Sequence, residues 1–142
     1  MQLKDMLAYK VAMLASDLSE SLSKEYAEYK LTKPEWRILA TLGGRNESSP
    51  KSLLTAKEIA IATRLDKVQV SRALERLVKR DAIVKRVSKR DKRATLISLS
   101  AEGERIYRAL LPKIVAWQNK RLENITEDEY RIFVKVIDAL TP

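Results

Sequence analysis

Two helix starts that lie close together in the middle of the chain constrain its fold more than any other feature. The run Thr55-Ala56-Lys57-Glu58 fits a capping box, in which the threonine and the glutamate each bind a free backbone N–H at a helix start. Asp66 is a second good N-cap, because its carboxylate can accept the free N–H groups of the next first turn. An apolar stripe at helical spacing follows, made of Val70, Leu74, Leu77 and Val78. Two short helices joined by about three residues predict a helix-turn-helix, with the second helix as the reader of DNA.

The opposite face of the second helix suits the reading of base pairs. At about 100° per residue, it carries Val68, Gln69, Arg72, Arg76 and Lys79. Gln and Arg side chains pair bidentately with adenine and guanine edges in a major groove, and Val can contact a thymine methyl group. A solvated basic helix is the alternative that this face alone leaves open.

Two runs rich in β-branched residues come next and predict a hairpin over residues 83–87 and 94–99. The polar turn between them, residues 88–93, carries four positive charges. A hairpin with a basic tip directly after a helix-turn-helix makes a winged helix, and the tip can reach a minor groove where narrow A·T tracts attract arginine. An ordinary solvated turn is the alternative.

The positive charge of the chain is concentrated in this region. Residues 64–93 hold twelve Lys or Arg and four Asp or Glu, so they carry +8 of the formal net charge of +9. Such a concentration favours a polyanionic partner.

These segments resemble the MarR (multiple antibiotic resistance regulator) family of bacterial and archaeal transcription factors. The similar stretches are residues 31–39, 54–60, 66–77, 91–94 and 97–103. The resemblance implies a mainly α fold with a small β-hairpin wing (α+β), in which a winged helix-turn-helix is flanked by N- and C-terminal dimerisation helices. It implies a single domain over residues 1–142, with the winged-helix module at about 53–99 and the dimerisation helices at about 1–30 and 101–142. It also implies a homodimer that binds a pseudo-palindromic operator in double-stranded DNA, usually as a repressor, and that is released from the DNA by a small ligand. The lack of a membrane-spanning run and of a signal-peptide core predicts a cytoplasmic location.

The resemblance also assigns roles to individual residues. It places Val68, Gln69 and Arg72 on bases, and Lys67, Ser71 and Arg76 on or near phosphates. The wing set is Lys89, Arg90, Lys92 and Arg93, of which Arg90 or Arg93 enters the minor groove. Asp91 orients a wing arginine through an ion pair. The family usually has glycine in a left-handed conformation after the recognition helix, and Asp81 stands there in this chain.

Helices are expected on both sides of the DNA module. The first, up to about Tyr29, has a stripe made of Leu3, Leu7, Val11, Leu14, Leu18 and Leu22. A helix after Thr32 should end at Gly43-Gly44 and precede a polar loop over residues 45–52. Another runs from Ser100 to about Leu122 with a bend at Pro112, and the last opens at the capping box of residues 126–129. The first helix has more apolar surface than its own chain is expected to cover, which favours a subunit interface over ordinary core packing.

Several classes of function are disfavoured by composition. The chain has no Cys and no His, which excludes disulfides, thiolate metal sites and the commonest general base. The chain has only three glycines and no glycine-rich motif for binding phosphate, so we expect no enzyme activity, no cofactor and no metal site. No apolar run reaches the roughly 20 residues of a membrane span. Tyr26, Tyr29, Trp36, Arg37 and Trp117 could line a crevice for an effector. Aromatic residues at helical spacing are more often part of the core, so no effector residues are predicted. A non-specific architectural or replication-associated nucleic-acid binder remains as the second hypothesis.

Overall fold

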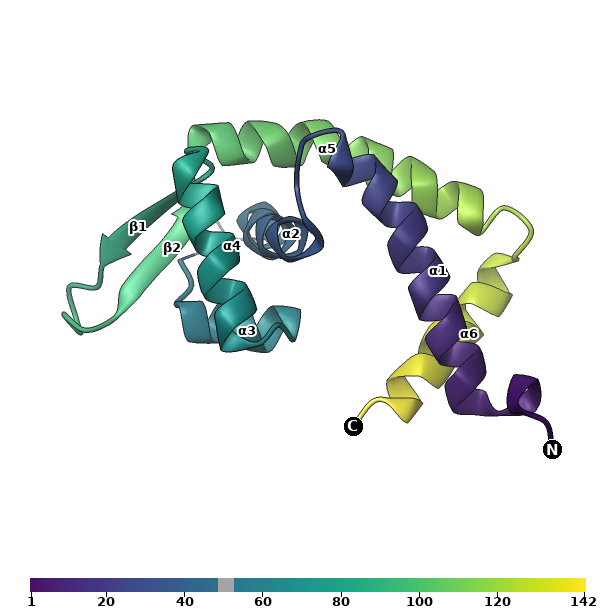
Figure 1. The fold of residues 1–142 in the computed structure, drawn as a ribbon. Coiled ribbons are helices and arrows are strands. Elements are labelled where there is room, and N and C mark those ends of the chain that lie inside the picture. The colour runs from purple at the N-terminus through teal and green to yellow at the C-terminus, as the bar shows by residue number, and fades with distance from the viewer. Residues whose placement is uncertain (49–52) are drawn as a thin grey trace.

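The computed structural model describes residues 1–48 and 53–142, and it consists of helices and one antiparallel hairpin (Figure 1). In chain order, a 3-10 turn at Leu3–Asp5 precedes α1 (Leu7–Ala27), α2 (Lys33–Ser48), α3 (Ala56–Thr63), α4 (Lys67–Lys79), β1 (Ile83–Val87), β2 (Thr95–Leu99), α5 (Ala101–Arg121) and α6 (Glu127–Leu140). The predicted fold class is confirmed. In the part of the chain that is described, no helix is both long and apolar enough to cross a bilayer.

Both predicted helix starts of the helix-turn-helix are present. The Thr55 hydroxyl accepts the N–H of Glu58 at 3.2 Å, and the Glu58 carboxylate accepts the N–H of Thr55 at 3.1 Å. Asp66 accepts the N–H of Gln69 at 2.7 Å. The turn between the helices passes through Arg64, whose φ of 56° lies in the left-handed region. These local bonds set the angle at which α4 leaves α3.

The end of α4 confirms the expectation at Asp81. Its φ is 56°, so it takes the left-handed conformation that glycine usually provides. The N–H of Ala82 donates to the Leu77 carbonyl at 2.9 Å, and the N–H of Asp81 donates to the Val78 carbonyl at 3.0 Å. The Ser100 hydroxyl also donates to the Asp81 carbonyl, which joins this turn to the start of α5.

The hairpin pairs Ile83 with Leu99 at its base and Val87 with Thr95 near its tip. A short extra pairing lies beside it, which the sequence did not predict. The N–H of Leu54 donates to the Ile97 carbonyl at 3.0 Å, and the N–H of Ile97 donates back at 2.7 Å. The segment before α3 is therefore attached to the wing.

The core packs α4 against α2 and the base of the hairpin. On α4 the buried residues are Val70, Ala73, Leu74 and Leu77. The prediction that Val78 belongs to this stripe was wrong, because its side chain is 40% exposed. Val78 lies about 80° around the helix from Val70, at the edge of the stripe, whereas Ala73 lies on the other side and is buried.

The prediction that α2 ends at Gly43-Gly44 was also wrong, because the helix continues to Ser48. Neither glycine has a positive φ. A Cβ at Gly43 would lie 2.6 Å from the Tyr107 ring, so this glycine allows α5 to approach α2 closely. Of the predicted loop, residues 45–48 are helical and residues 49–52 lie outside the described part of the chain.

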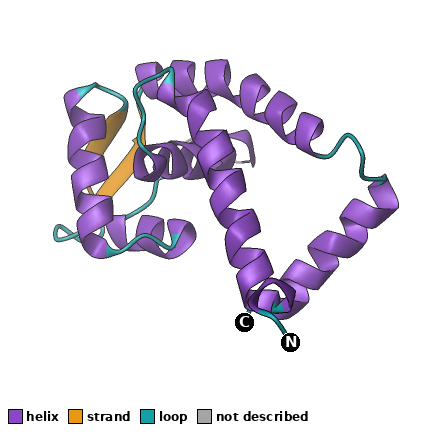
Figure 2. Ribbon diagram, turned by 45° about the vertical axis from the view of Figure 1, so that its right-hand side comes forward, coloured by secondary structure: helices purple, strands orange, loops and turns teal. Residues whose placement is uncertain are grey.

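The two terminal helices leave apolar surface uncovered. Leu3 in the 3-10 turn is exposed, as are Leu7, Val11 and Leu14 at the start of α1, whereas Leu22 packs against the core. Helix α6 has no buried residue and stands apart from the winged helix (Figure 2). It follows α5, which continues through Pro112 and curves across the molecule (Figure 1).

Candidate nucleic-acid interface

Helix α4 and the hairpin lie at the same end of the molecule, away from α6 (Figure 1). The side chains of the predicted recognition set on α4 are exposed, namely Lys67, Val68, Gln69, Ser71, Arg72, Arg76 and Lys79. Arg72 has no ion pair or side-chain hydrogen bond to any other residue that the structure describes, so its guanidinium is available to a base edge.

Gln69 has a structural role that sequence reasoning did not assign. Its side-chain oxygen accepts the N–H of Asp66 at 3.1 Å and completes the capping box at the start of α4. A bidentate pair with adenine needs both the oxygen and the amide nitrogen. Gln69 would therefore have to leave the cap in order to read adenine in this way.

Arg76 also has a partner inside the molecule. Its Nε donates to Oε1 of Glu35 on α2 at 2.5 Å, and Glu35 is 3% exposed. Lys79, one turn further along α4, is exposed. The predicted phosphate contacts on this helix therefore include one side chain that is already held by a buried carboxylate.

The wing tip is ordered by hydrogen bonds to its backbone. The Ser88 hydroxyl accepts the N–H groups of Arg90 and Asp91, at 3.2 Å and 3.3 Å. Asp91 accepts the N–H of Arg93 at 3.0 Å, while no arginine side chain of the described residues pairs with it. In this structure Asp91 shapes the turn, and the cationic side chains remain exposed at Lys89, Arg90, Lys92 and Arg93.

A groove of about 630 Å³ lies between α4 and the hairpin. Three lysines from three different elements line it, Lys57 of α3, Lys67 of α4 and Lys85 of β1, together with Ser71. Sequence reasoning did not place Lys57 and Lys85 beside the recognition helix. The only signal was the overall basic charge of the region, because α3 and β1 come together only through the fold.

A second hollow separates α1 from the start of α2. A cavity of about 700 Å³ is lined by Tyr26, Thr32, Lys33 and Arg37 among others, and a smaller one beside it also involves Trp36 and Trp117. The smaller cavity is about 240 Å³ in volume. Burial raises the pKa of the Tyr26 hydroxyl, and the nearby Arg37 charge only partly opposes the shift. The hydroxyl is therefore protonated at neutral pH.

These aromatic residues serve the core as well as the hollow. Tyr26 stacks on Trp36 with ring centroids 6.1 Å apart, and Trp36 stacks on Tyr107 at 6.5 Å. The core interpretation of Tyr26 and Trp36 is therefore confirmed, and both residues line the cavities too. Trp117 is only half-buried, and its indole N–H donates to the Ser21 hydroxyl at 2.9 Å.

A curated relative supports the interpretation of the module as a helix-turn-helix. The chain is 26% identical over 84 residues to the HTH-type transcriptional regulator BilQ of Clostridium symbiosum (strain WAL-14163). This alignment covers 59% of the chain, and the chain spans 58% of the length of that relative.

Solved structures share the fold over nearly the whole chain. BpsR of Bordetella bronchiseptica matches with a TM-score of 0.85 at 15% identity, covering 99% of this chain and 96% of that one. The PcaV transcriptional regulator of Streptomyces coelicolor matches with a TM-score of 0.82 at 21% identity, covering 99% and 94% of the two chains. The MarR family model matches residues 29–94, which include α2, the helix-turn-helix and most of the wing. Over this segment the chain is similar to the MarR family.

Proposed function

We propose that the chain is a sequence-specific, DNA-binding transcription regulator, most simply a repressor. The observation that carries this proposal is the exposed face of α4, where Arg72 has no ion pair or side-chain hydrogen bond to another described residue. The basic hairpin follows this helix directly in the chain. The similarity to the MarR family supports the expectation that the chain is not an enzyme. A regulator of prokaryotic genes would act on DNA in the cytoplasm.

In this proposal α4 enters a major groove. Val68, Gln69 and Arg72 contact base edges, and Lys67, Ser71 and Lys79 contact phosphates. The wing cations Lys89, Arg90, Lys92 and Arg93 approach the neighbouring minor groove, with Asp91 holding the turn. The groove between α4 and the hairpin offers Lys57 and Lys85 as further phosphate contacts.

We propose a homodimer as the DNA-binding form. The support is the apolar surface of α1 and α6 that this chain leaves uncovered, including Leu7, Val11, Phe133 and Ile137. Contiguous exposed apolar surface of this kind is typical of protein interfaces. A two-fold axis between the copies would place two recognition helices about 34 Å apart, in successive major grooves of a pseudo-palindromic operator.

We propose that a small anionic aromatic molecule binds in the hollow between α1 and α2 and thereby causes the chain to release DNA. Lys33 and Arg37 supply positive charge there, and Tyr26 and Trp36 supply ring surface. Among the similar structures, DNA binding by BpsR is regulated by 6-hydroxynicotinic acid, and PcaV is seen with its natural ligand. Such a ligand must favour a spacing of the two readers that does not fit the operator.

Replacing Arg72 with alanine should separate base reading from general attraction to DNA. We expect a loss of about 1–3 kcal/mol on the operator and a much smaller loss on random duplex, because only the operator offers the matched base edge. Fluorescence anisotropy with both duplexes measures this difference. Equal losses on the two duplexes would contradict the assignment of Arg72 as a base reader.

Replacing Lys89 at the wing tip with alanine should give the opposite pattern, as should the same change at Lys79. Each loses an exposed cation that contacts phosphate, so binding to operator and to random duplex should weaken to a similar degree. The slope of log K against log salt should become shallower by about one unit per lost contact. An unchanged slope with a loss confined to the operator would show that the lysine reads bases instead.

Selection from a random-sequence duplex pool tests the proposed function itself. The expected result is enrichment of one pseudo-palindromic sequence with half-sites one helical turn apart. If the retained pool shows no enriched sequence while still binding tightly at low salt, the chain is a non-specific architectural binder.

A further inference from the structure

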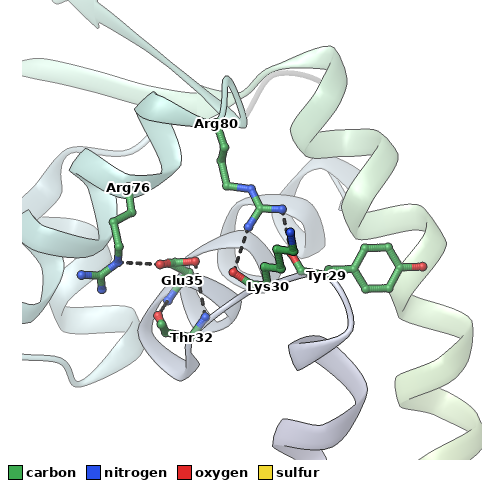
Figure 3. Close-up of polar contacts among 6 residues, drawn as sticks. All are labelled: Tyr29, Lys30, Thr32, Glu35, Arg76 and Arg80. Carbon is green, nitrogen blue, oxygen red and sulfur yellow. Dashed lines mark hydrogen bonds and ion pairs between the residues drawn. The ribbon is translucent and has the colours of Figure 1, made fainter.

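Two arginines, one in the second half of α4 and one directly after this helix, bind the corner where α1 joins α2 (Figure 3). Arg76 Nε donates to Glu35 Oε1 at 2.5 Å. Arg80, just after the helix, donates from Nη2 to the Tyr29 carbonyl at 2.7 Å and from Nη1 to the Lys30 carbonyl at 3.1 Å. Both arginines therefore connect the reading helix to a distant part of the sequence.

The Glu35 carboxylate is buried and needs this partner. At 3% exposed, it is the one charged side chain in the core of the described residues. Its Oε2 accepts the N–H of Thr32 at 3.4 Å, and Oε1 accepts from Arg76. A buried charge is costly unless it is paired, so the ion pair favours one position of α4 against α2.

The corner that receives Arg80 has a defined backbone shape. Lys30 has a φ of 58°, in the left-handed region. The N–H of Lys30 donates to the Ala27 carbonyl at 2.8 Å, and the N–H of Leu31 donates to the Tyr26 carbonyl at 3.3 Å. Because these hydrogen bonds end α1, the carbonyls of Tyr29 and Lys30 can accept hydrogen bonds from the planar guanidinium of Arg80.

We propose that Arg76 and Arg80 are positioning residues, which hold the recognition helix at a fixed place on the α1–α2 corner, with Glu35 as the buried anchor. This inference rests on the proposed function, because it concerns the helix that reads DNA. Base reading requires side chains to be placed within about 0.5 Å, whereas attraction to phosphates tolerates small displacements. Loss of the anchor should therefore reduce specificity more than general affinity.

The Glu35→Gln variant tests this inference, because Glu35 is buried and cannot itself contact DNA. We would measure dissociation constants from about 50 to 200 mM salt, for the duplex enriched by the wild-type chain and for a random duplex of equal length. We expect the affinity for the enriched duplex to fall about tenfold and the affinity for the random duplex to fall less than about twofold. The slope of log K against log salt should stay unchanged. Arg80→Met should give the same pattern.

Glu123→Gln is the matched control, since Glu123 lies between α5 and α6 and forms an exposed ion pair with Lys120 at 3.1 Å. It should bind both duplexes as the wild type does. Thermal unfolding establishes that each variant is folded at the assay temperature, and Arg80→Met carries the test if Glu35→Gln unfolds.

Two results would overturn the inference. One is wild-type binding to both duplexes by Glu35→Gln and Arg80→Met. The other is an Arg76→Met variant that loses the same affinity on both duplexes and has a salt slope shallower by about one unit, while Glu35→Gln has no effect. Arg76 would then be a phosphate contact only. Failure of the wild-type chain to enrich any duplex counts against the proposed function instead.

Discussion

Replacing Gly103 with alanine should lower the free energy of unfolding by about 3 kcal/mol and the Tm by roughly 10 °C. A Cβ at this position would lie 2.0 Å from the carbonyl oxygen of Ala82 and 3.2 Å from the Leu99 side chain. The Ala82 carbonyl cannot move freely, because it accepts the N–H of Ser100 at 3.0 Å at the junction between the wing and α5. Relief of the clash must therefore separate α5 from the base of the hairpin.

Gly44→Ala is the matched control for this prediction. Apart from its chain neighbours and the backbone of its own helix, no atom of the described residues lies within 4 Å of a Cβ placed there, and the residue is within α2. Alanine should stabilise this helix by about 0.5–1 kcal/mol. Chemical denaturation at one protein concentration measures both variants. A Gly103→Ala variant as stable as the wild type would contradict the close approach of α5 to the turn after α4.

Replacing Phe133 of α6 with glutamate should convert the proposed homodimer into monomers and reduce operator affinity by about 100-fold or more. Phe133 is 45% exposed in the single chain and lies on the uncovered apolar face. A charge buried in the interface without a partner is strongly unfavourable, and a two-fold axis introduces two of them. Without the dimer, the second recognition helix loses the effective concentration that its partner supplies.

Sedimentation analysis and operator titration measure the two effects separately. Ile61→Glu is the control for molar mass, because Ile61 on α3 is also apolar and is 71% exposed, but lies outside α1 and α6. It should remain dimeric. A dimeric Phe133→Glu variant with wild-type operator affinity would contradict the assignment of α6 to the interface.

The helix-turn-helix and the wing were predictable because local chemistry sets their boundaries. Thr55 and Asp66 cap the two helices through residues three positions away, and the caps are seen as expected. Asp81 likewise takes the left-handed conformation that its position requires. The hairpin follows from two runs rich in β-branched residues on either side of a polar turn.

The features that sequence reasoning missed depend on partners far along the chain. Gly43 was read as a helix end, but its role is set by the ring of Tyr107. Arg76 has the helical position of a DNA contact, yet its partner Glu35 belongs to another helix. Lys57 and Lys85 meet at one groove only because α3 packs beside the hairpin. Periodicity describes a face of a helix, but not the residue that covers it.

A competition gel shift tests the central claim most directly. The wild-type chain is titrated against the enriched duplex in the presence of excess random duplex, at a fixed salt concentration near the physiological value. The account predicts a discrete complex that survives the competitor, with an affinity at least about 10³ times that for random DNA. A diffuse shift that the competitor abolishes, with nearly equal affinities for the two duplexes, would contradict it.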